Sequence, residues 1–262
     1  MTNHTHTRLI SGKTVSILGA AAALLIQTGC ASSTKQANWG YDGARGPAHW
    51  SELNPDSAVC ADGKEQSPVD IPAGAPINPA KIKFHYQPSA LNIVNNGHTI
   101  QVNYDQGSSI KVEGKRYELL QFHFHALSEH TIDGEHSEME AHFVHQSSDG
   151  EYAVVGVLLN RGAANRAFAP TLKNLPAKTG MEKTVEGVSV NAIDMLPRDR
   201  SYYRYDGSFT TPPCTEGVRW FVMASPVMLS GAQIDAFASL YDNNYRPVQP
   251  MYDRRFLVRR DG

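Results

Sequence analysis

The sequence has little net charge and no hydrophobic run long enough to span a bilayer. Its 262 residues carry a formal net charge of -2 at pH 7, which gives no electrostatic reason to expect a nucleic acid or another polyanion as a partner. Charged residues make up 19% and hydrophobic residues 41% of the chain, so a disordered or collagen-like protein is excluded. The H-E-x-x-H and G-x-S-x-G patterns are also missing, and nothing indicates a hydrolase of those classes.

The first thirty residues have the pattern of an export signal. A polar start that contains Arg8 and Lys13 precedes an apolar run over 15–26, which is too short to span a bilayer. Small and polar residues follow it. We therefore expect residues 1–30 to be an export signal, 31–38 a tether and 39–262 a single domain. No linker, repeat or low-complexity run divides that domain.

The end of the signal resembles a bacterial lipobox, in which the cysteine at Cys30 is lipidated and becomes the mature N-terminus. Gln27 departs from this pattern, where leucine is usual, so cleavage by an ordinary signal peptidase near Ala31 is the alternative. The pattern predicts an exported, periplasmic protein that is lipid-anchored to the outer membrane if Cys30 is modified. No other membrane contact is expected.

Cysteine is scarce, with Cys30, Cys60 and Cys214 as the three copies. If Cys30 carries lipid, Cys60 and Cys214 can pair in an oxidising compartment. Two buried free thiols are the alternative.

Alternating apolar and polar residues dominate the domain and predict half-buried strands. The clearest predicted strands are residues 91–95, 99–104, 117–125, 139–145 and 152–159, the last nearly all apolar. Asn96-Gly97 is a two-residue hairpin signal between the first two, and Ser230 can cap a helix that contains Ile234, Phe237 and Tyr241. We expect a mainly β (α+β) fold with a large, mostly antiparallel sheet and short peripheral helices.

Histidines gather on two of these predicted strands. His123 and His125 are two residues apart, so both imidazoles project from the same face of their strand. His142 lies on the next predicted strand, and antiparallel pairing brings it beside the other two. Three neutral imidazoles that face one point form a zinc site with an open fourth position. On this pattern alone, solvent-facing or core histidines are the alternative.

Other polar residues bear on this site. Gln121 and Glu140 each lie two residues before one of these histidines, on the same face, and can hydrogen-bond the back of its imidazole. For Glu140, a solvated carboxylate is the alternative. His145 is expected on the opposite strand face from His142, and His136 in an exposed turn.

Several motifs, in the same order along the chain, resemble those of α-class carbonic anhydrases, and the resemblance covers residues 39–262. These motifs are WGY at 39–41, GPAHW at 46–50, QSPVDI at 66–71, NNGH at 95–98, QFHFH at 121–125, SEHT at 128–131, EAHFVH at 140–145, GSFTTPPCTE at 207–216 and NYRPVQP at 244–250.

The resemblance implies a twisted, mainly antiparallel sheet of about ten strands with zinc at the base of a cone-shaped cleft. It implies an enzyme, a zinc lyase, that reversibly hydrates carbon dioxide to bicarbonate and a proton by attack of zinc-bound hydroxide. One Zn(2+) per chain is expected on the three histidines. Thr210 is expected to accept a hydrogen bond from that hydroxide, Glu129 to orient Thr210, and His98 to shuttle protons.

Further positions follow from the same resemblance. The carbonyl of Asn244 is expected behind His125, and Cys60 with Cys214 matches a family disulfide. Phe209 departs from the leucine that is frequent there, so a narrower cleft and altered inhibitor fit are expected. The substrate pocket is expected to comprise Val144, Val154, Phe209, Thr211, Val218 and Trp220, and the ordered-water path Tyr41, Asn96, Gln101 and Thr211.

The resemblance also implies carbon dioxide and bicarbonate as reactants and sulfonamides and anions as inhibitors. The protein is expected to be a monomer or a homodimer. A catalytically silent binding protein on the same fold is the alternative. Such relatives lack one or more zinc ligands, whereas this chain has all three histidines, Thr210 and Glu129. For His98, which follows Asn-Gly and can therefore be exposed and mobile, a surface histidine without a role is the alternative.

Overall fold

The computed structural model describes residues 39–258. The expected export signal (1–30), the tether (31–38) and Cys30 lie outside these residues, so they stay predictions. Within 39–258, no helix is long and apolar enough to cross a membrane.

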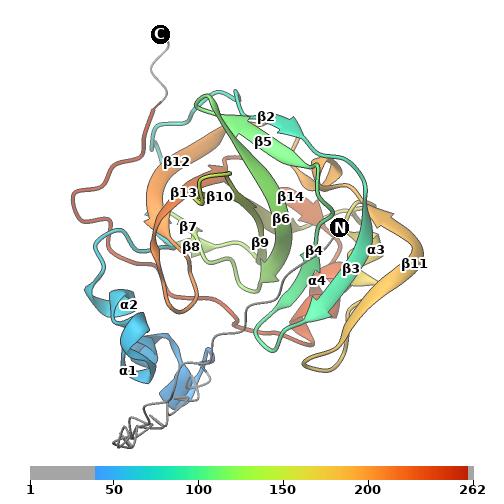
Figure 1. Cartoon of the computed structure of the whole chain (residues 1–262), viewed down its shortest axis with the longest axis horizontal. Helices are drawn as coiled ribbons and strands as arrows, with labels where there is room; N and C mark the ends of the chain where they lie inside the picture. The colour runs from blue at the N-terminus through green and yellow to red at the C-terminus, as the bar shows by residue number, and fades with distance from the viewer. Residues whose placement is uncertain (1–38, 259–262) are drawn as a thin grey trace, which may run out of the picture. The chain divides into compact units, whose positions relative to one another are not determined.

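One large twisted sheet dominates the described chain (Figure 1). Its main path runs β11-β3-β4-β6-β9-β10-β13-β12, while β5 pairs with β6, β2 with β5 and β14 with β10. The strands of this sheet are β2 (Lys83–His85), β3 (Ser89–Asn95), β4 (Ile100–Asn103), β5 (Ser109–Val112), β6 (Lys115–His125), β9 (Met139–Gln146), β10 (Tyr152–Arg161), β11 (Glu182–Val190), β12 (Tyr202–Ser208), β13 (Glu216–Met223) and β14 (Val227–Leu229). A small separate sheet contains β1 (Asp70–Ile71), β7 (Thr131–Ile132) and β8 (Glu135–His136).

The predicted fold class is confirmed, with two differences in detail. The large sheet has 11 strands within the described residues, against the expected number of about ten. It is antiparallel except where β10 pairs in parallel with β13 and β14. Parallel neighbours need a long crossover, and the chain supplies one between Arg161 and Glu216.

The hairpin between β3 and β4 is longer than predicted. Asn95 pairs with Ile100, so the loop spans residues 96–99 and not two residues. The side-chain oxygen of Asn96 accepts the backbone N–H groups of His98 and Thr99, both at 2.9 Å. Gly97 has a φ of 91°, which is the left-handed conformation that favours glycine. The Asn side chain therefore closes a wider turn than the Asn-Gly pair alone predicts.

Helices are short and few in the described chain, as expected. In α4 (Gly231–Ala238), Ser230 and Gln233 cap each other reciprocally, which confirms the predicted start. The helix ends before Tyr241, which was expected on it. The other helices are α1 (Trp50–Leu53), α2 (Val59–Asp62) and α3 (Ala169–Leu172), with 3-10 turns η1 (Gly43–Arg45), η2 (Pro47–His49), η3 (Pro55–Ser57) and η4 (Ala192–Met195).

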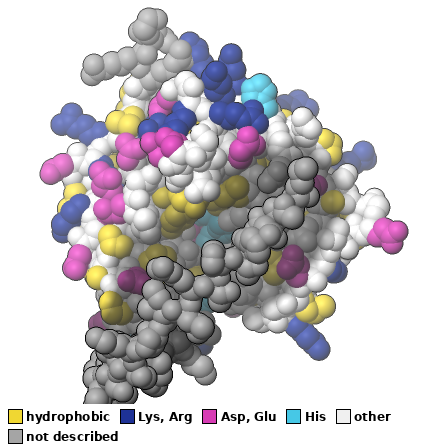
Figure 2. All heavy atoms as spheres, in the orientation of Figure 1, with side chains coloured by type: hydrophobic (Ala, Val, Ile, Leu, Met, Phe, Trp, Pro, Cys, Tyr) yellow, Lys and Arg dark blue, Asp and Glu magenta, His cyan; other side chains and the backbone are white. Residues whose placement is uncertain are grey.

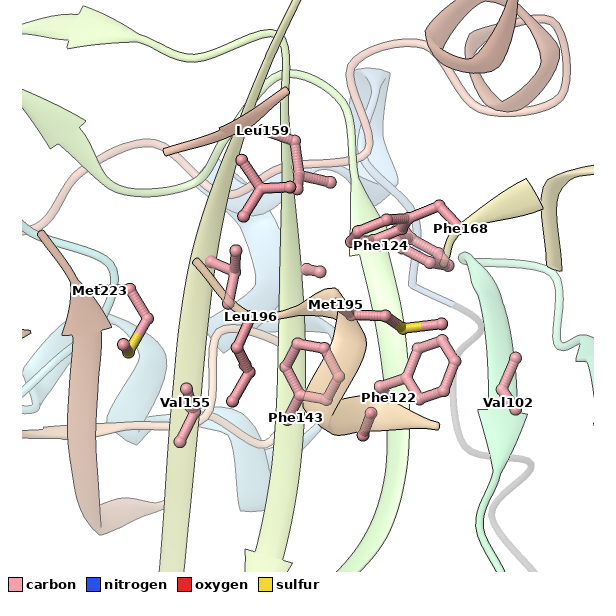
Figure 3. Packing of buried hydrophobic residues seen from close by; sticks show 14 of the residues in the cluster. Val102, Phe122, Phe124, Phe143, Val155, Leu159, Phe168, Met195, Leu196 and Met223 are labelled. Carbon is pink, nitrogen blue, oxygen red and sulfur yellow. The ribbon is translucent and has the colours of Figure 1, made fainter. Parts of the chain in front are cut away.

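One face of β6 and β9 packs into the main apolar core (Figure 3). Phe122, Phe124 and Phe143 are 0% exposed there, and burying each side chain contributes roughly 1.5–3 kcal/mol. Since successive side chains on a strand point to opposite faces, these phenylalanines turn His123 and His125 to the other face. The core thus fixes the direction of both imidazoles.

A disulfide joins Cys60 and Cys214, which are 154 residues apart in sequence. It packs in a small cluster with Trp50 and ties α2 to the loop after β12. The predicted pairing is confirmed, and the alternative of two free thiols is wrong.

Candidate metal centre and active-site cleft

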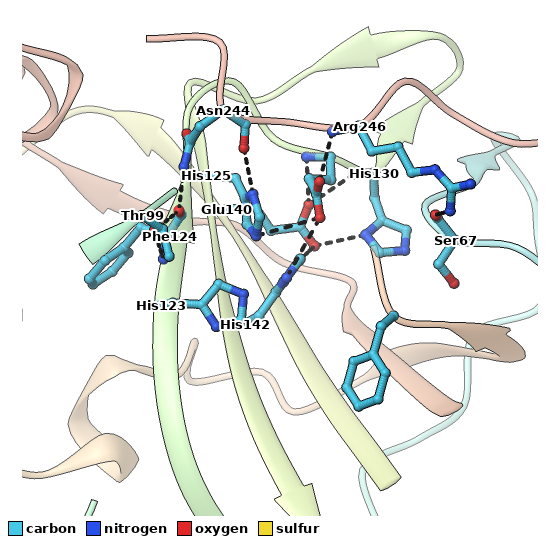
Figure 4. A network of polar contacts seen from close by, with 12 residues as sticks. Ser67, Thr99, His123, Phe124, His125, His130, Glu140, His142, Asn244 and Arg246 are labelled. Atoms are coloured by element: carbon cyan, nitrogen blue, oxygen red, sulfur yellow. Dashed lines mark hydrogen bonds and ion pairs between the residues drawn. The ribbon is translucent and has the colours of Figure 1, made fainter. Parts of the chain in front are cut away.

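Three imidazoles converge on one point between β6 and β9 (Figure 4). His123 stands directly opposite His142 in the antiparallel register of these strands, and His125 follows two residues later on β6. One nitrogen from each of the three rings lies within 4.8 Å of the others. The expected strand pairing therefore does bring the three histidines together.

Each ring is held from behind by a separate partner. Gln121 Oε1 lies 2.9 Å from Nδ1 of His123, and the carbonyl oxygen of Asn244 lies 2.7 Å from Nδ1 of His125. Glu140 Oε1 lies 3.0 Å from Nε2 of His142. These contacts leave Nε2 of His123, Nε2 of His125 and Nδ1 of His142 facing the common point.

The three imidazoles are poor proton acceptors in this setting. Burial, together with the neighbouring histidines, holds the pKa of His123 well below its usual range. Burial lowers the pKa of His125 to about 4, and it lowers that of His142 although Glu140 opposes it. All three are therefore neutral at pH 7, the form that binds a metal.

The residues fit a zinc ion. Neutral imidazole nitrogens are ligands that zinc prefers, and three of them leave a fourth position open. Nε2 of His125 is buried and has no hydrogen-bond partner among the described residues, although burying a polar nitrogen without one is costly. A metal at the common point would satisfy it. The two other histidines raised from the sequence are elsewhere: His145 is buried on the core side, and His136 is exposed on β8.

A carboxylate lies beside the metal-ligating atoms. Glu129 is 0% exposed, and its Oε2 lies 3.5 Å from Nε2 of His125. Burial raises the pKa of Glu129 to about 7, while hydrogen bonds from the Thr210 hydroxyl and the Arg246 backbone N–H oppose this increase. A dication nearby would further favour the ionised carboxylate. The structure thus joins Glu129 to Thr210, as the family resemblance implies.

The histidines lie in a cleft of about 300 Å³. Figure 2 shows histidine side chains in a hollow of this face, beside hydrophobic ones. Residues from the N-terminal segment, β4, β9, β10 and the loop after β12 line it with the histidines. Of the positions expected at the site, the lining includes Tyr41, Asn96, His98, Gln101, Gln121, Val144, Val154, Phe209, Thr210, Thr211 and Trp220.

Four expected residues do not line the cleft. Glu129, Glu140 and Asn244 are buried behind it, at the contacts given above. Val218 was expected in the pocket wall, but it is 1% exposed and packs in the apolar cluster with Trp220. Both face the same side of β13, and the larger indole is the one that reaches the cleft.

Two aromatic contacts shape the cleft. Phe209 packs edge-on against Tyr152, with ring centroids 4.8 Å apart. His98 is half-buried and stacks on Trp39, with centroids 3.6 Å apart and planes 7° apart. The indole covers one face of the ring, so His98 is only partly exposed, and its mobility stays a prediction. Burial, and to a smaller extent the charge of Arg45, lowers the pKa of His98.

A family model described as eukaryotic-type carbonic anhydrase matches residues 45–260. The chain belongs to this carbonic anhydrase family. The resemblance drawn from the motifs is confirmed, and the chain is an enzyme of this class.

Individual relatives agree. A carbonic anhydrase of Nostoc sp. is 41% identical over 245 residues, which is 92% of each chain. The α-carbonic anhydrase of Thermovibrio ammonificans, solved with the inhibitor sulfanilamide, has a TM-score of 0.81 at 41% identity. The match covers 85% of this chain and 99% of the Thermovibrio chain. A carbonic anhydrase of Chlamydomonas reinhardtii, solved with acetazolamide, has a TM-score of 0.73 at 37% identity. The match covers 84% of this chain and 98% of the Chlamydomonas chain.

Several buried polar residues near the site of this carbonic anhydrase have no signal in the sequence patterns. His130 contacts Glu140 Oε1 through Nδ1 at 2.8 Å, and Tyr205 lies beyond it. Arg246 is 2% exposed and hydrogen-bonds Gln66 and the carbonyls of Ser67 and Cys60. These residues lie within or near the family motifs, but no spacing rule singles them out.

Proposed function

We propose that the chain catalyses the reversible hydration of carbon dioxide to bicarbonate and a proton, with one zinc ion held by His123, His125 and His142. The observation that carries the proposal is the convergence of the three ring nitrogens, within 4.8 Å of one another, with each ring held from behind. Membership of the carbonic anhydrase family supports the reaction.

When bound, zinc supplies Lewis acidity that lowers the pKa of a bound water to about 7, a value established for carbonic anhydrases and not obtained from this structure. Thr210 then orients the nucleophile. Its hydroxyl has one hydrogen and two lone pairs. With the hydrogen directed to Glu129, the oxygen of Thr210 can only accept. The nucleophile therefore donates a hydrogen bond to the Thr210 oxygen and keeps a lone pair free for carbon dioxide.

The apolar wall of the cleft suits carbon dioxide, which has no net charge. Val144 and Val154 are 6% and 1% exposed and offer no hydrogen-bonding group. The indole N–H of Trp220 donates to the carbonyl of Ser208 at 2.9 Å, so its ring presents only apolar surface to the cleft. This wall excludes water from the place where the substrate rests.

His98 is proposed to move the released proton to solvent. Its ring is on the cleft lining and half-buried, so one side faces the site while part of it reaches water. A pKa below the ordinary value of about 6.5 favours release of the proton to solvent at pH 7. Tyr41, Asn96, Gln101 and Thr211 are proposed to hold the intervening waters.

We also propose that the protein is exported to the periplasm. The pattern of residues 1–30 and the Cys60–Cys214 disulfide support an oxidising compartment. Lipidation at Cys30 and a monomeric or homodimeric state stay predictions. Sulfonamide inhibition is supported by the two solved relatives with such inhibitors, and the altered fit expected from Phe209 stays a prediction.

The His125→Ala variant tests the proposal. Stopped-flow hydration and elemental analysis should show fast turnover and about one zinc per chain in the wild type, with both lost in the variant. His49→Ala, which removes an exposed histidine away from the cleft, is the control and should behave as the wild type. Bound zinc with no hydration in the wild type would instead favour the silent binding protein.

A further inference from the structure

A chain of buried polar groups leads away from the back of His142 (Figure 4). Glu140 Oε1 contacts Nδ1 of His130 at 2.8 Å as well as Nε2 of His142 at 3.0 Å. On the far side, Nε2 of His130 lies 2.6 Å from Oη of Tyr205. Oη of Tyr205 in turn lies 2.8 Å from Oγ of Ser67. Glu140, His130, Tyr205 and Ser67 are all 0% exposed, so no bulk water competes for these contacts.

Every polar side chain along this chain has a neighbour within hydrogen-bond distance. Glu140 Oε2 accepts two backbone N–H groups, from Glu129 and His130, each at 2.9 Å. Its Oε1 contacts Nδ1 of His130 at 2.8 Å and lies 3.0 Å from Nε2 of His142. On the far side, the hydroxyl of Tyr205 donates to Oγ of Ser67, and its oxygen lies 2.6 Å from Nε2 of His130. The nearby carboxylate favours the tautomer of His142 with its proton on Nε2, and Nδ1 of that ring then carries a free lone pair.

The space around this chain depends on two glycines. Gly156 stands opposite His142 on β10, and a Cβ there would lie 2.8 Å from Glu140 Oε1. A Cβ at Gly207 would collide with Oγ of Ser67 and lie 2.8 Å from the Tyr205 ring. Only glycine at positions 156 and 207 therefore leaves space for Glu140 and for Ser67, which lie toward opposite ends of this chain of polar groups.

We propose that Tyr205 is a positioning residue for metal binding. Through His130 it fixes the Glu140 carboxylate, and through Glu140 it fixes the tautomer and direction of His142, whose Nδ1 faces the metal position. Loss of the hydroxyl leaves Nε2 of the His130 ring without its buried partner, and the ring becomes free to turn away from Glu140. The inference rests on the proposed zinc site and deepens it.

The test is zinc release from the loaded protein. The Tyr205→Phe variant removes only the hydroxyl and keeps the buried ring. With excess EDTA as the zinc acceptor, we expect zinc to leave this variant about 10-fold faster than the wild type, the lower end of the range for partners behind metal ligands. Tyr203→Phe is the matched control: it lies on the same face of β12, its hydroxyl is not part of this chain, and its release rate should equal that of the wild type.

A second pair of variants separates positioning from general loosening. If Tyr205 acts through Glu140, adding Tyr205→Phe to a Glu140→Gln variant should change zinc release less than about twofold. A full 10-fold effect in that background, or a Tyr205→Phe variant that melts earlier as metal-free protein but releases zinc at the wild-type rate, would overturn the inference. A wild type that holds no zinc would overturn the proposed function itself, which is a different result.

Discussion

The Thr210→Val variant is expected to hydrate carbon dioxide with a kcat/KM about 100-fold below that of the wild type, while it keeps its zinc. Valine fills nearly the same volume as threonine but has no oxygen to accept the hydrogen bond from the nucleophile. The buried carboxylate of Glu129 also loses its hydrogen bond from residue 210. None of the three ring nitrogens that face the metal position is altered. The loss should therefore appear in turnover measured by stopped-flow and not in metal content.

Thr215→Val is the matched control for this substitution. It lies five residues further along the same loop and is exposed outside the cleft, so its kcat/KM should stay at the wild-type value. A Thr210→Val variant that keeps half of the wild-type kcat/KM would contradict the orienting role. Loss of zinc from that variant would assign the effect to the metal site instead.

The second large effect is on stability at acid pH and comes from His145, which faces the core. Its Nε2 lies 2.7 Å from Oη of Tyr86, and its Nδ1 lies 3.2 Å from the carbonyl of Ala153. Burial lowers its pKa to about 3, although the backbone hydrogen bonds oppose the shift. The unfolded chain, with an ordinary pKa of about 6.5, therefore takes up a proton where the folded chain does not.

The sign follows from that difference. As the pH falls through about 6.5 toward 3, the unfolded state binds one more proton at residue 145, and the free energy of unfolding decreases. Between pH 7 and pH 5, protonation of residue 145 in the unfolded state should lower the free energy of unfolding by about 2 kcal/mol. In a His145→Gln variant, whatever its stability at pH 7, that part of the decrease should be absent. Urea denaturation at the two pH values, with equal zinc loading, measures it.

His85→Gln is the control, because His85 is an exposed histidine on β2. Its unfolding free energy should show the wild-type dependence on pH. If His145→Gln also keeps the full wild-type decrease between pH 7 and pH 5, His145 is not a neutral buried base in the folded protein.

Local sequence patterns predicted the strands that carry the site, because apolar residues recur at every second position, although β9 proves to be buried on both faces. The alternation in β6 separates Phe122 and Phe124 from His123 and His125, and the structure follows it. The parallel pairing of β10 with β13 has no local signal, since the strands meet only after a long crossover. The four-residue hairpin before β4 depends on the side chain of Asn96, which a two-residue turn rule ignores.

Some contacts of the site could likewise be predicted from local spacing, and others could not. Two-residue spacing placed Gln121 and Glu140 beside the imidazoles, and their contacts are present. His130 follows the end of β6 outside any strand, and only the folded chain brings its ring against Glu140 and Tyr205. The half-buried setting of His98 depends on Trp39, which is far away in sequence. Such tertiary contacts have no spacing of their own and had to come from the structure.

Titration of metal-free protein with zinc, with carbon dioxide hydration measured at each addition, tests the central claim most directly. The site predicts hydration that rises in proportion to added zinc and stops rising at about one zinc per chain, since three imidazoles offer one tetrahedral position. Hydration that is absent at every zinc concentration, or that reaches its maximum without added metal, would contradict a zinc-dependent enzyme built on His123, His125 and His142.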